Sequence, residues 1–199
     1  MTVKDLEARI ATCTLCAERF AATETAHVPR PVVYPSTTAK VLIAGQAPGA
    51  RVHASGLPFD DPSGDRLRDW LSVDRDTFYD RERFAIVPMA FCFPGYDARG
   101  SDLPPPRLCA RTWRNEVLAA MPQVELTLVI GQYAQAWHMQ GQRKKTLTDT
   151  VRAWREYGPK LLPLPHPSWR NTAWLKKNSW FAKDVLPWLR SEISRLVSR

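Results

Sequence analysis

Residues 41–49 read VLIAGQAPG, so a short apolar run passes directly into a loop with two glycines. The pattern returns much later, where Lys160–Leu164 (KLLPL) is followed by His166–Asn171 (HPSWRN). Ligands of open α/β sheets bind beyond the carboxyl ends of the strands, where such loops lie. We therefore expect the two loops to form one site. The first offers close backbone approach and an amide side chain, and the second offers a histidine followed by a proline.

The alternation of apolar and amphipathic segments indicates the fold class. Four short apolar segments are typical of buried parallel strands: Val41–Ala44, Phe84–Met89, Leu126–Ile130 and Lys160–Leu164. Helical periodicity occurs in Ser63–Leu71, which begins with a residue suited to capping, and in Arg107–Met121, Tyr133–Met139 and Trp180–Val197. This order predicts a three-layer α/β/α sandwich with a central four-stranded parallel sheet. We expect residues 1–199 to form a single domain, in which Pro94–Pro106 is a long loop.

The composition indicates a basic globular protein. The chain has 199 residues, of which 44% are hydrophobic, a net charge of +8 and an isoelectric point near 9.6. No apolar run approaches the ~20 residues of a membrane span, and the first residues lack the apolar stretch of a secretory signal. We expect a cytoplasmic protein without membrane association, and we expect it to be a monomer. The positive charge favours a polyanionic partner, and the eight tryptophans include candidates for stacking on bases.

The four cysteines fall into two pairs. Cys13 and Cys16 form a C-x2-C motif, and Cys92 and Cys109 form a C-x16-C motif. Disulfides are disfavoured in a cytoplasmic protein, where such spacing is typical of metal or cluster ligation. Four thiolates suit either tetrahedral zinc or a [4Fe–4S] cluster, and the spacing does not distinguish the two.

Taken together, these motifs resemble those of a known family. The order C-x2-C, G-x-A-P-G after a strand, G-x-P-F, C-x16-C and H-P-S is similar to that of the iron–sulfur uracil-DNA glycosylases of the uracil-DNA glycosylase superfamily. The first family loop usually reads GEAPG and the next GRPF, where this chain has Gly45–Gly49 (GQAPG) and Gly56–Phe59 (GLPF) at matching separation. H-P-S alone is a weak signal, but five motifs in one order over Ala11–Trp180 are specific.

The resemblance implies a cofactor and a base-binding pocket. The implied ligands of a [4Fe–4S] cluster are Cys13, Cys16, Cys92 and Cys109. The resemblance assigns base stacking to Phe59 and stabilisation of the leaving base to His166. It assigns contacts with the flipped base to Gly45, Gln46 and Ala47.

The resemblance also implies a DNA surface and an activity. Trp169, Arg170 and Asn171 follow the histidine at positions that face DNA in relatives. Trp169 would be a wedge in the vacated base stack, and Arg170 would contact a phosphate or the orphan base. The implied activity is hydrolysis of the N-glycosidic bond of uracil or a related damaged base in DNA, as in base excision repair.

This sequence departs from the family pattern at three places. Pro88 stands where the family reads uracil with an asparagine, and it offers neither a side-chain amide nor a backbone N–H. Ala50–His53 (ARVH) lacks the acidic residues that usually follow the first loop, although His53 is a candidate for binding water. Gln46 replaces the family glutamate. We therefore expect an altered base preference.

Base excision requires a hydrogen-bond donor for the leaving base and a carboxylate that positions water. His166 as a neutral imidazole is the expected donor. Asp60, directly after Phe59, is the first candidate for the carboxylate. The adjacent Asp61 is a second candidate, although it suits a turn or helix cap equally well. Gln46 both donates and accepts, so it is a candidate for reading the base or orienting water.

Two other functions remain open at this point. One is nucleic-acid binding without catalysis by a member of the same fold, because the asparagine and the acidic residues are missing. The other is hydrolysis of a free nucleotide or nucleoside in the same pocket. The net charge of +8 and the basic residues after His166 argue against the latter.

Overall fold

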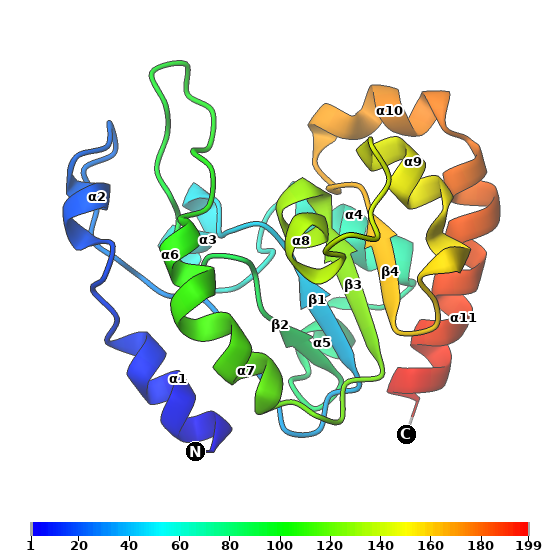
Figure 1. Ribbon diagram of the computed structural model, residues 1–199, viewed down its shortest axis with the longest axis horizontal. Helices are drawn as coiled ribbons and strands as arrows, with labels where there is room; N and C mark the ends of the chain where they lie inside the picture. Colours follow the sequence, from blue (N-terminus) through cyan, green and yellow to red (C-terminus); the bar gives the residue numbers. More distant parts are fainter. Residues whose placement is uncertain (1, 199) are drawn as a thin grey trace.

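A four-stranded, wholly parallel sheet forms the centre of the protein, as a computed structural model describing residues 2–198 shows (Figure 1). Its strands are β1 (Val41–Ala44), β2 (Phe84–Ile86), β3 (Leu126–Ile130) and β4 (Leu161–Leu164), arranged in the order β2-β1-β3-β4. Ile43 of β1 lies opposite Ile86 of β2 and Leu128 of β3. The predicted parallel sheet is confirmed.

The second strand is shorter than the predicted Phe84–Met89. It ends at Ile86, two residues before Pro88, which has no N–H to donate to a neighbouring strand. The chain nevertheless continues beside β1, because the N–H of Val87 donates to the Ile43 carbonyl and that of Met89 to the Gly45 carbonyl, each at 2.9 Å. Pro88 is thereby placed at the carboxyl end of the sheet, next to the first loop.

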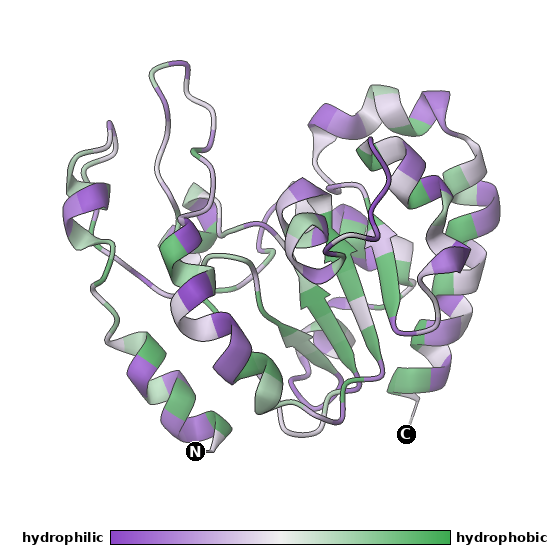
Figure 2. Cartoon of the chain, viewed as in Figure 1, coloured by the Kyte–Doolittle hydropathy of each residue, from purple (hydrophilic) through white to green (hydrophobic). Residues whose placement is uncertain are grey.

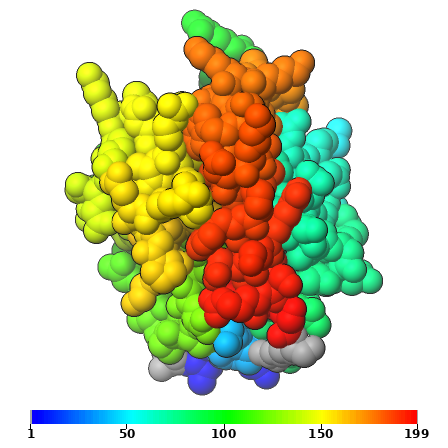
Figure 3. All heavy atoms as spheres, turned by 90° about the vertical axis from the view of Figure 1, so that its right-hand side faces the viewer, coloured from blue at the N-terminus to red at the C-terminus, as the bar shows by residue number. Residues whose placement is uncertain are grey.

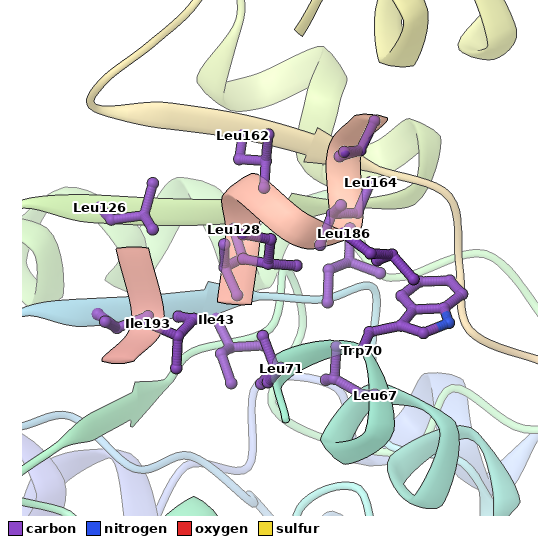
Figure 4. Packing of buried hydrophobic residues seen from close by; sticks show 14 of the residues in the cluster. Ile43, Leu67, Trp70, Leu71, Leu126, Leu128, Leu162, Leu164, Leu186 and Ile193 are labelled. Carbon is purple, nitrogen blue, oxygen red and sulfur yellow. The ribbon is translucent and has the colours of Figure 1, made fainter. Parts of the chain in front are cut away.

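One face of the sheet is covered by α4 (Pro62–Leu71) and α11 (Leu186–Val197), with contributions from α5 (Arg75–Tyr79) and α9 (Leu147–Arg152). Figure 4 shows Leu67 of α4 and Ile193 of α11 directed toward Ile43 and Leu128 of the sheet, and these side chains are at most 1% exposed. On the outside, α11 lies between α4 and the segment that contains α9 (Figure 3). The apolar stripe predicted for the last helix therefore faces the core.

The opposite face is covered by α1 (Val3–Ala11), α7 (Asn115–Ala119) and α8 (Gly131–His138). Leu6 and Val117 pack there against Leu42 and Val87. The strands are strongly hydrophobic between two amphipathic helical layers (Figure 2). Side chains that alternate along each strand thus enter two cores, which confirms the predicted three-layer sandwich.

The predicted helices are present, but some contain π-helical turns and one is capped by a residue other than Ser63. Arg107–Met121 consists of α6 (Arg107–Cys109), a π-helical turn (Ala110–Arg114) and α7, and the last predicted helix begins with a π-helical turn (Phe181–Val185). Asp61 and Ser63 are both suited to capping this helix by sequence, and the cap is Asp61 rather than Ser63. Asp61 is the N-cap of α4, and its carboxylate accepts a hydrogen bond of 2.9 Å from the Gly64 N–H.

Three further helices are too short to be recognised from periodicity: α2 (Ala17–Ala21), α3 (Ala50–Ser55) and α10 (Thr172–Lys177). The segment 94–106 carries no helix or named strand, as predicted. Among the helices of residues 2–198, none is both long and apolar enough to cross a membrane.

Candidate active site

The loop after β1 and the loop after β4 line one pocket of about 580 Å³ at the carboxyl end of the sheet. Residues of the segments 58–63 and 94–102 also line it. Of the residues assigned to the base or to DNA from the sequence, those in the wall are Gly45, Gln46, Ala47, Phe59, His166, Trp169, Arg170 and Asn171. Residues more than a hundred positions apart in the chain are therefore assembled around one cavity.

His166 is held as a neutral imidazole with its donor nitrogen free. The Ser168 N–H donates to Nδ1 of His166 at 3.2 Å, which assigns the ring proton to Nε2. Burial lowers the pKa of His166, Asp61 opposes this shift, and Arg170 adds to it. Nε2 has no hydrogen-bond partner among residues 2–198, so it can donate to a ligand in the pocket.

The histidine loop is braced from behind. The Asn171 amide donates to the His166 carbonyl at 2.7 Å, and Arg66 of α4 donates to the Ser168 carbonyl at 2.8 Å. Asn171, assigned to DNA from the sequence, therefore has its amide engaged within its own loop. Trp169, by contrast, is 72% exposed, with the Arg170 guanidinium 5.7 Å from its ring centroid.

Phe59 lines the pocket in a strained backbone conformation. Its φ of 56° is in the left-handed region, which is unusual for a bulky residue. Gly64 makes this conformation possible, because a Cβ atom there would lie 1.7 Å from the Phe59 carbonyl oxygen. The ring lies beside the first loop, where a Cβ on Gly45 would be 3.4 Å from it. The fold thus places an aromatic face beside the glycine loop.

Gln46 presents a side-chain amide without a hydrogen-bond partner in the described part of the chain. Its backbone is fixed, because the Ala90 N–H donates to the Gln46 carbonyl at 3.1 Å. This loop is tied to the chain beyond β2, while its amide remains available to the pocket.

The family model of the uracil DNA glycosylase superfamily matches residues 31–190. The chain belongs to the uracil DNA glycosylase superfamily. This membership supports a DNA glycosylase type of function in general terms, with DNA as the partner. The matched range contains both pocket loops together with Cys92 and Cys109, whereas Cys13 and Cys16 lie before it.

The carboxylates of this superfamily member are arranged differently from what the sequence indicates. Asp60 is not in the pocket wall. Its carboxylate accepts a hydrogen bond from Arg75 at 3.0 Å, and this bond lowers the pKa of Asp60. Asp61 is in the wall but caps α4. His53 is not in the pocket wall. Its ring lies 5.1 Å from that of His27, and its Nδ1 is buried without a hydrogen-bond partner among residues 2–198.

Asp102 is a pocket residue that sequence reasoning missed. It lies on the loop between Cys92 and Cys109, which periodicity identifies only as a loop. Partial burial raises the pKa of Asp102, Arg170 opposes this shift, and Asp61 adds to it. The only sequence signal for its place is that it lies between Cys92 and Cys109, the second pair of predicted ligands.

Pro88 forms part of an apolar stretch of wall with Val32, Ile86 and Pro94. Behind it lies Arg114, a completely buried arginine that donates to the Pro88 carbonyl at 2.9 Å and to the Val87 carbonyl at 3.2 Å. Arg114 also contacts Nε2 of His138. Burial lowers the pKa of Arg114 to about 9, so the group remains a cation at neutral pH.

The four cysteines gather in one region between the first two helices and the loop 92–109. All are free thiols. Burial raises the pKa of Cys92 to about 12 and that of Cys109 to about 12. The charges of Cys13 and Cys16 add to both shifts, so the two pairs lie within electrostatic range of each other. Within residues 2–198, no three His, Cys, Asp or Glu side chains form a group that could hold a metal ion.

Proposed function

We propose that this protein is a DNA glycosylase that hydrolyses the N-glycosidic bond of uracil or a related damaged base in DNA, as in base excision repair. The observation that carries the proposal is the Ser168–His166 hydrogen bond, which leaves a neutral Nε2–H donor in the same pocket as Phe59. Superfamily membership supports the general class of reaction.

His166 has the main catalytic role in this proposal. As the glycosidic bond breaks, negative charge develops on the departing base, and the Nε2–H stabilises it by donating to a base carbonyl. A fixed donor of this kind accelerates reactions by about 10²–10³-fold. Phe59 supplies a stacking face, and Gly45 to Ala47 bring the backbone close to the base edge.

The apolar wall at Pro88 argues for a base other than uracil as the preferred substrate. A proline presents no donor or acceptor side chain, so discrimination at this edge rests on shape. The amide of Gln46 is the nearby group that can read polar atoms of the base, since it is unpartnered and lines the pocket.

Trp169 and Arg170 are the proposed contacts with DNA. A flipped base leaves a gap in the stack, and an inserted side chain offsets a few kcal/mol of unstacking. Trp169 is suited to this role because it is exposed at the pocket. Asn171 supports the loop from within by its bond to the His166 carbonyl.

We also propose a [4Fe–4S] cluster on Cys13, Cys16, Cys92 and Cys109. Each iron of such a cluster binds one thiolate, so its cysteines stand farther apart than the ligands of a single ion. The two cysteine pairs lie within electrostatic range of each other, which supports one group shared by both pairs. When bound, the cluster would link the N-terminal segment to the loop 92–109 as a structural element.

The cluster is tested by purification under anoxic conditions, followed by iron, sulfide and zinc analysis and an absorption spectrum. About four irons and four sulfides for each protein would support the cluster. A colourless protein that contains zinc would overturn it.

The activity is tested with oligonucleotides that carry deaminated or oxidised bases, in single and double strands, and with the corresponding free nucleosides. We expect excision from DNA, and a rate about 10²–10³-fold lower for His166→Ala. His53→Ala is the matched control, because His53 lies outside the pocket wall. DNA binding without excision would favour the non-catalytic alternative, and cleavage of nucleosides alone would favour the hydrolase.

A further inference from the structure

The pocket lacks an acidic residue on the first loop, and the carboxylates next to Phe59 are engaged elsewhere. Asp60 is paired with Arg75 outside the wall, and one oxygen of Asp61 accepts from the Gly64 N–H. Asp102 also lines the pocket, and its carboxylate has no hydrogen bond or ion pair within residues 2–198. Among the described residues, Asp102 is therefore the pocket carboxylate with neither oxygen engaged.

The loop that carries Asp102 has a defined internal structure. Asp102 pairs with Tyr96 in an antiparallel bridge, and the Leu103 N–H donates to the Gly95 carbonyl at 2.8 Å. At the tip, the Asp97 carboxylate accepts from two backbone N–H groups at 2.9 Å each. Figure 1 shows this segment as the long green loop above α6, the helix that it precedes in the chain. These bonds fix Asp102 at the base of a hairpin-like loop.

Asp102 lines the same pocket as the Gly45–Gly49 loop and the His166 loop. Its carboxylate is close enough to Asp61 and Arg170 for both charges to act on it, and the same two residues act on His166. The Asp102 carboxylate and the His166 imidazole line the same pocket and are influenced by the same two charged residues. The raised pKa of Asp102 makes its carboxylate a better proton acceptor than an ordinary exposed aspartate.

We propose that Asp102 is the carboxylate that binds the attacking water and takes its proton, an inference that rests on the proposed glycosylase function. The water oxygen forms a bond to C1′ of deoxyribose while the C1′–N bond breaks, and the electron pair of that bond leaves with the base. His166 Nε2–H donates to the base carbonyl. The water proton passes to Asp102 and then to solvent, and the base anion takes up a proton from solvent.

The first test compares single-turnover excision by Asp102→Asn and Asp97→Asn on the base that the wild type removes fastest. Both variants lose one negative charge on the same loop. Asp97 is outside the pocket wall, and an asparagine oxygen can still accept its two N–H bonds. We expect Asp102→Asn to lower the rate by about 10²-fold or more and to remove the acid limb of the pH–rate profile. Asp97→Asn should keep the wild-type rate and the acid limb. A normal rate and profile for Asp102→Asn would overturn the inference and leave the proposed function standing.

The second test does not depend on turnover. Affinity is measured for DNA with a cationic pyrrolidine abasic site and with a neutral tetrahydrofuran abasic site. We expect the wild type and Asp97→Asn to prefer the cation, and Asp102→Asn to lose that preference. If no base is excised by the wild type, the proposed function fails. A preference that survives in Asp102→Asn would show that this carboxylate does not face the sugar, and would overturn the inference.

Discussion

Arg114 donates a hydrogen bond of 2.9 Å to the carbonyl oxygen of Pro88, so a buried cation supports the pocket wall from behind. Its charge also acts on Cys109 and lowers the pKa of that thiol against the larger effect of burial. One side chain therefore lies between the cysteine region and the wall of the pocket.

Arg114→Lys is expected to destabilise the fold by about 1–3 kcal/mol. Lysine keeps the charge but lacks the planar fork that reaches Val87, Pro88 and His138, so buried acceptors lose their partners. Urea unfolding measures this change. Arg111→Lys, an exposed position in the same helical segment, is the matched control. Equal unfolding midpoints for the two variants would contradict the proposed support.

Stability should fall below neutral pH because of His138. Burial, together with the Arg114 charge, lowers the pKa of His138 to about 3, whereas an unfolded histidine titrates near 6.5. Between these values the unfolded state binds the extra proton. The stabilisation that comes from keeping His138 neutral in the folded state is therefore complete above about pH 6.5. Below that pH the free energy of unfolding declines toward pH 3, by at most about 1.4 kcal/mol for each pH unit. Urea unfolding from pH 4.5 to 7 should show a weaker pH dependence for His138→Gln, and parallel curves would argue against this assignment.

The sheet and the two strand-end loops could be predicted because both depend on local pattern. Buried parallel strands read as continuous apolar runs, and the loops follow them directly. The carboxylates could not be assigned in this way. Asp60 and Asp61 are neighbours in sequence, yet one pairs with Arg75 on another helix while the other caps α4. Sequence adjacency to Phe59 does not determine which side chain enters the pocket.

Asp102 and Arg114 were missed for a related reason. Asp102 lies in the pocket wall because of the path of its loop. That path depends on the bridge between Tyr96 and Asp102 and on contacts with residues far away in the chain. Arg114 appears from its charge to be a surface residue, but a π-helical turn lies at this point of the helix and the side chain is buried against backbone carbonyls. Neither relationship leaves a periodic signal in the sequence.

Ser168→Pro tests how the His166 tautomer is set. Ser168 has a φ of −63°, which lies in the range of proline, but the proline Cδ would take the place of the N–H that donates to Nδ1. The substitution therefore removes the bond and also displaces the His166 ring. Loss of the bond alone, about 1.4 kcal/mol, corresponds to an excision rate about tenfold lower, and displacement of the ring lowers the rate further. Ser168→Ala keeps the N–H and should excise normally in the same single-turnover assay. Equal rates for the two variants would show that this bond does not set the tautomer.

Gly64→Ala should disturb Phe59. The added Cβ would meet the Phe59 carbonyl at 1.7 Å, so the strained turn or the start of α4 must move. We expect a loss of about 1–3 kcal/mol in the free energy of unfolding, together with slower excision. Gly49→Ala is the control for stability, because a Cβ there meets nothing within 4 Å. A variant as stable and as active as the wild type would show that the turn relaxes without cost.

Trp169→Ala should impair excision from double-stranded DNA more than from single-stranded DNA. Flipping a base out of a duplex breaks its stacking, which costs a few kcal/mol, and the inserted Trp169 ring offsets this cost. A single strand has no such duplex stack, so it loses less when the ring is removed. Trp169 is 72% exposed, and its removal should therefore leave the unfolding midpoint unchanged. The ratio of single-turnover rates on matched single- and double-stranded oligonucleotides is the measurement. An equal loss on both substrates would instead assign Trp169 to general DNA contact, because a residue that only binds the strand contributes whether or not a partner strand is present.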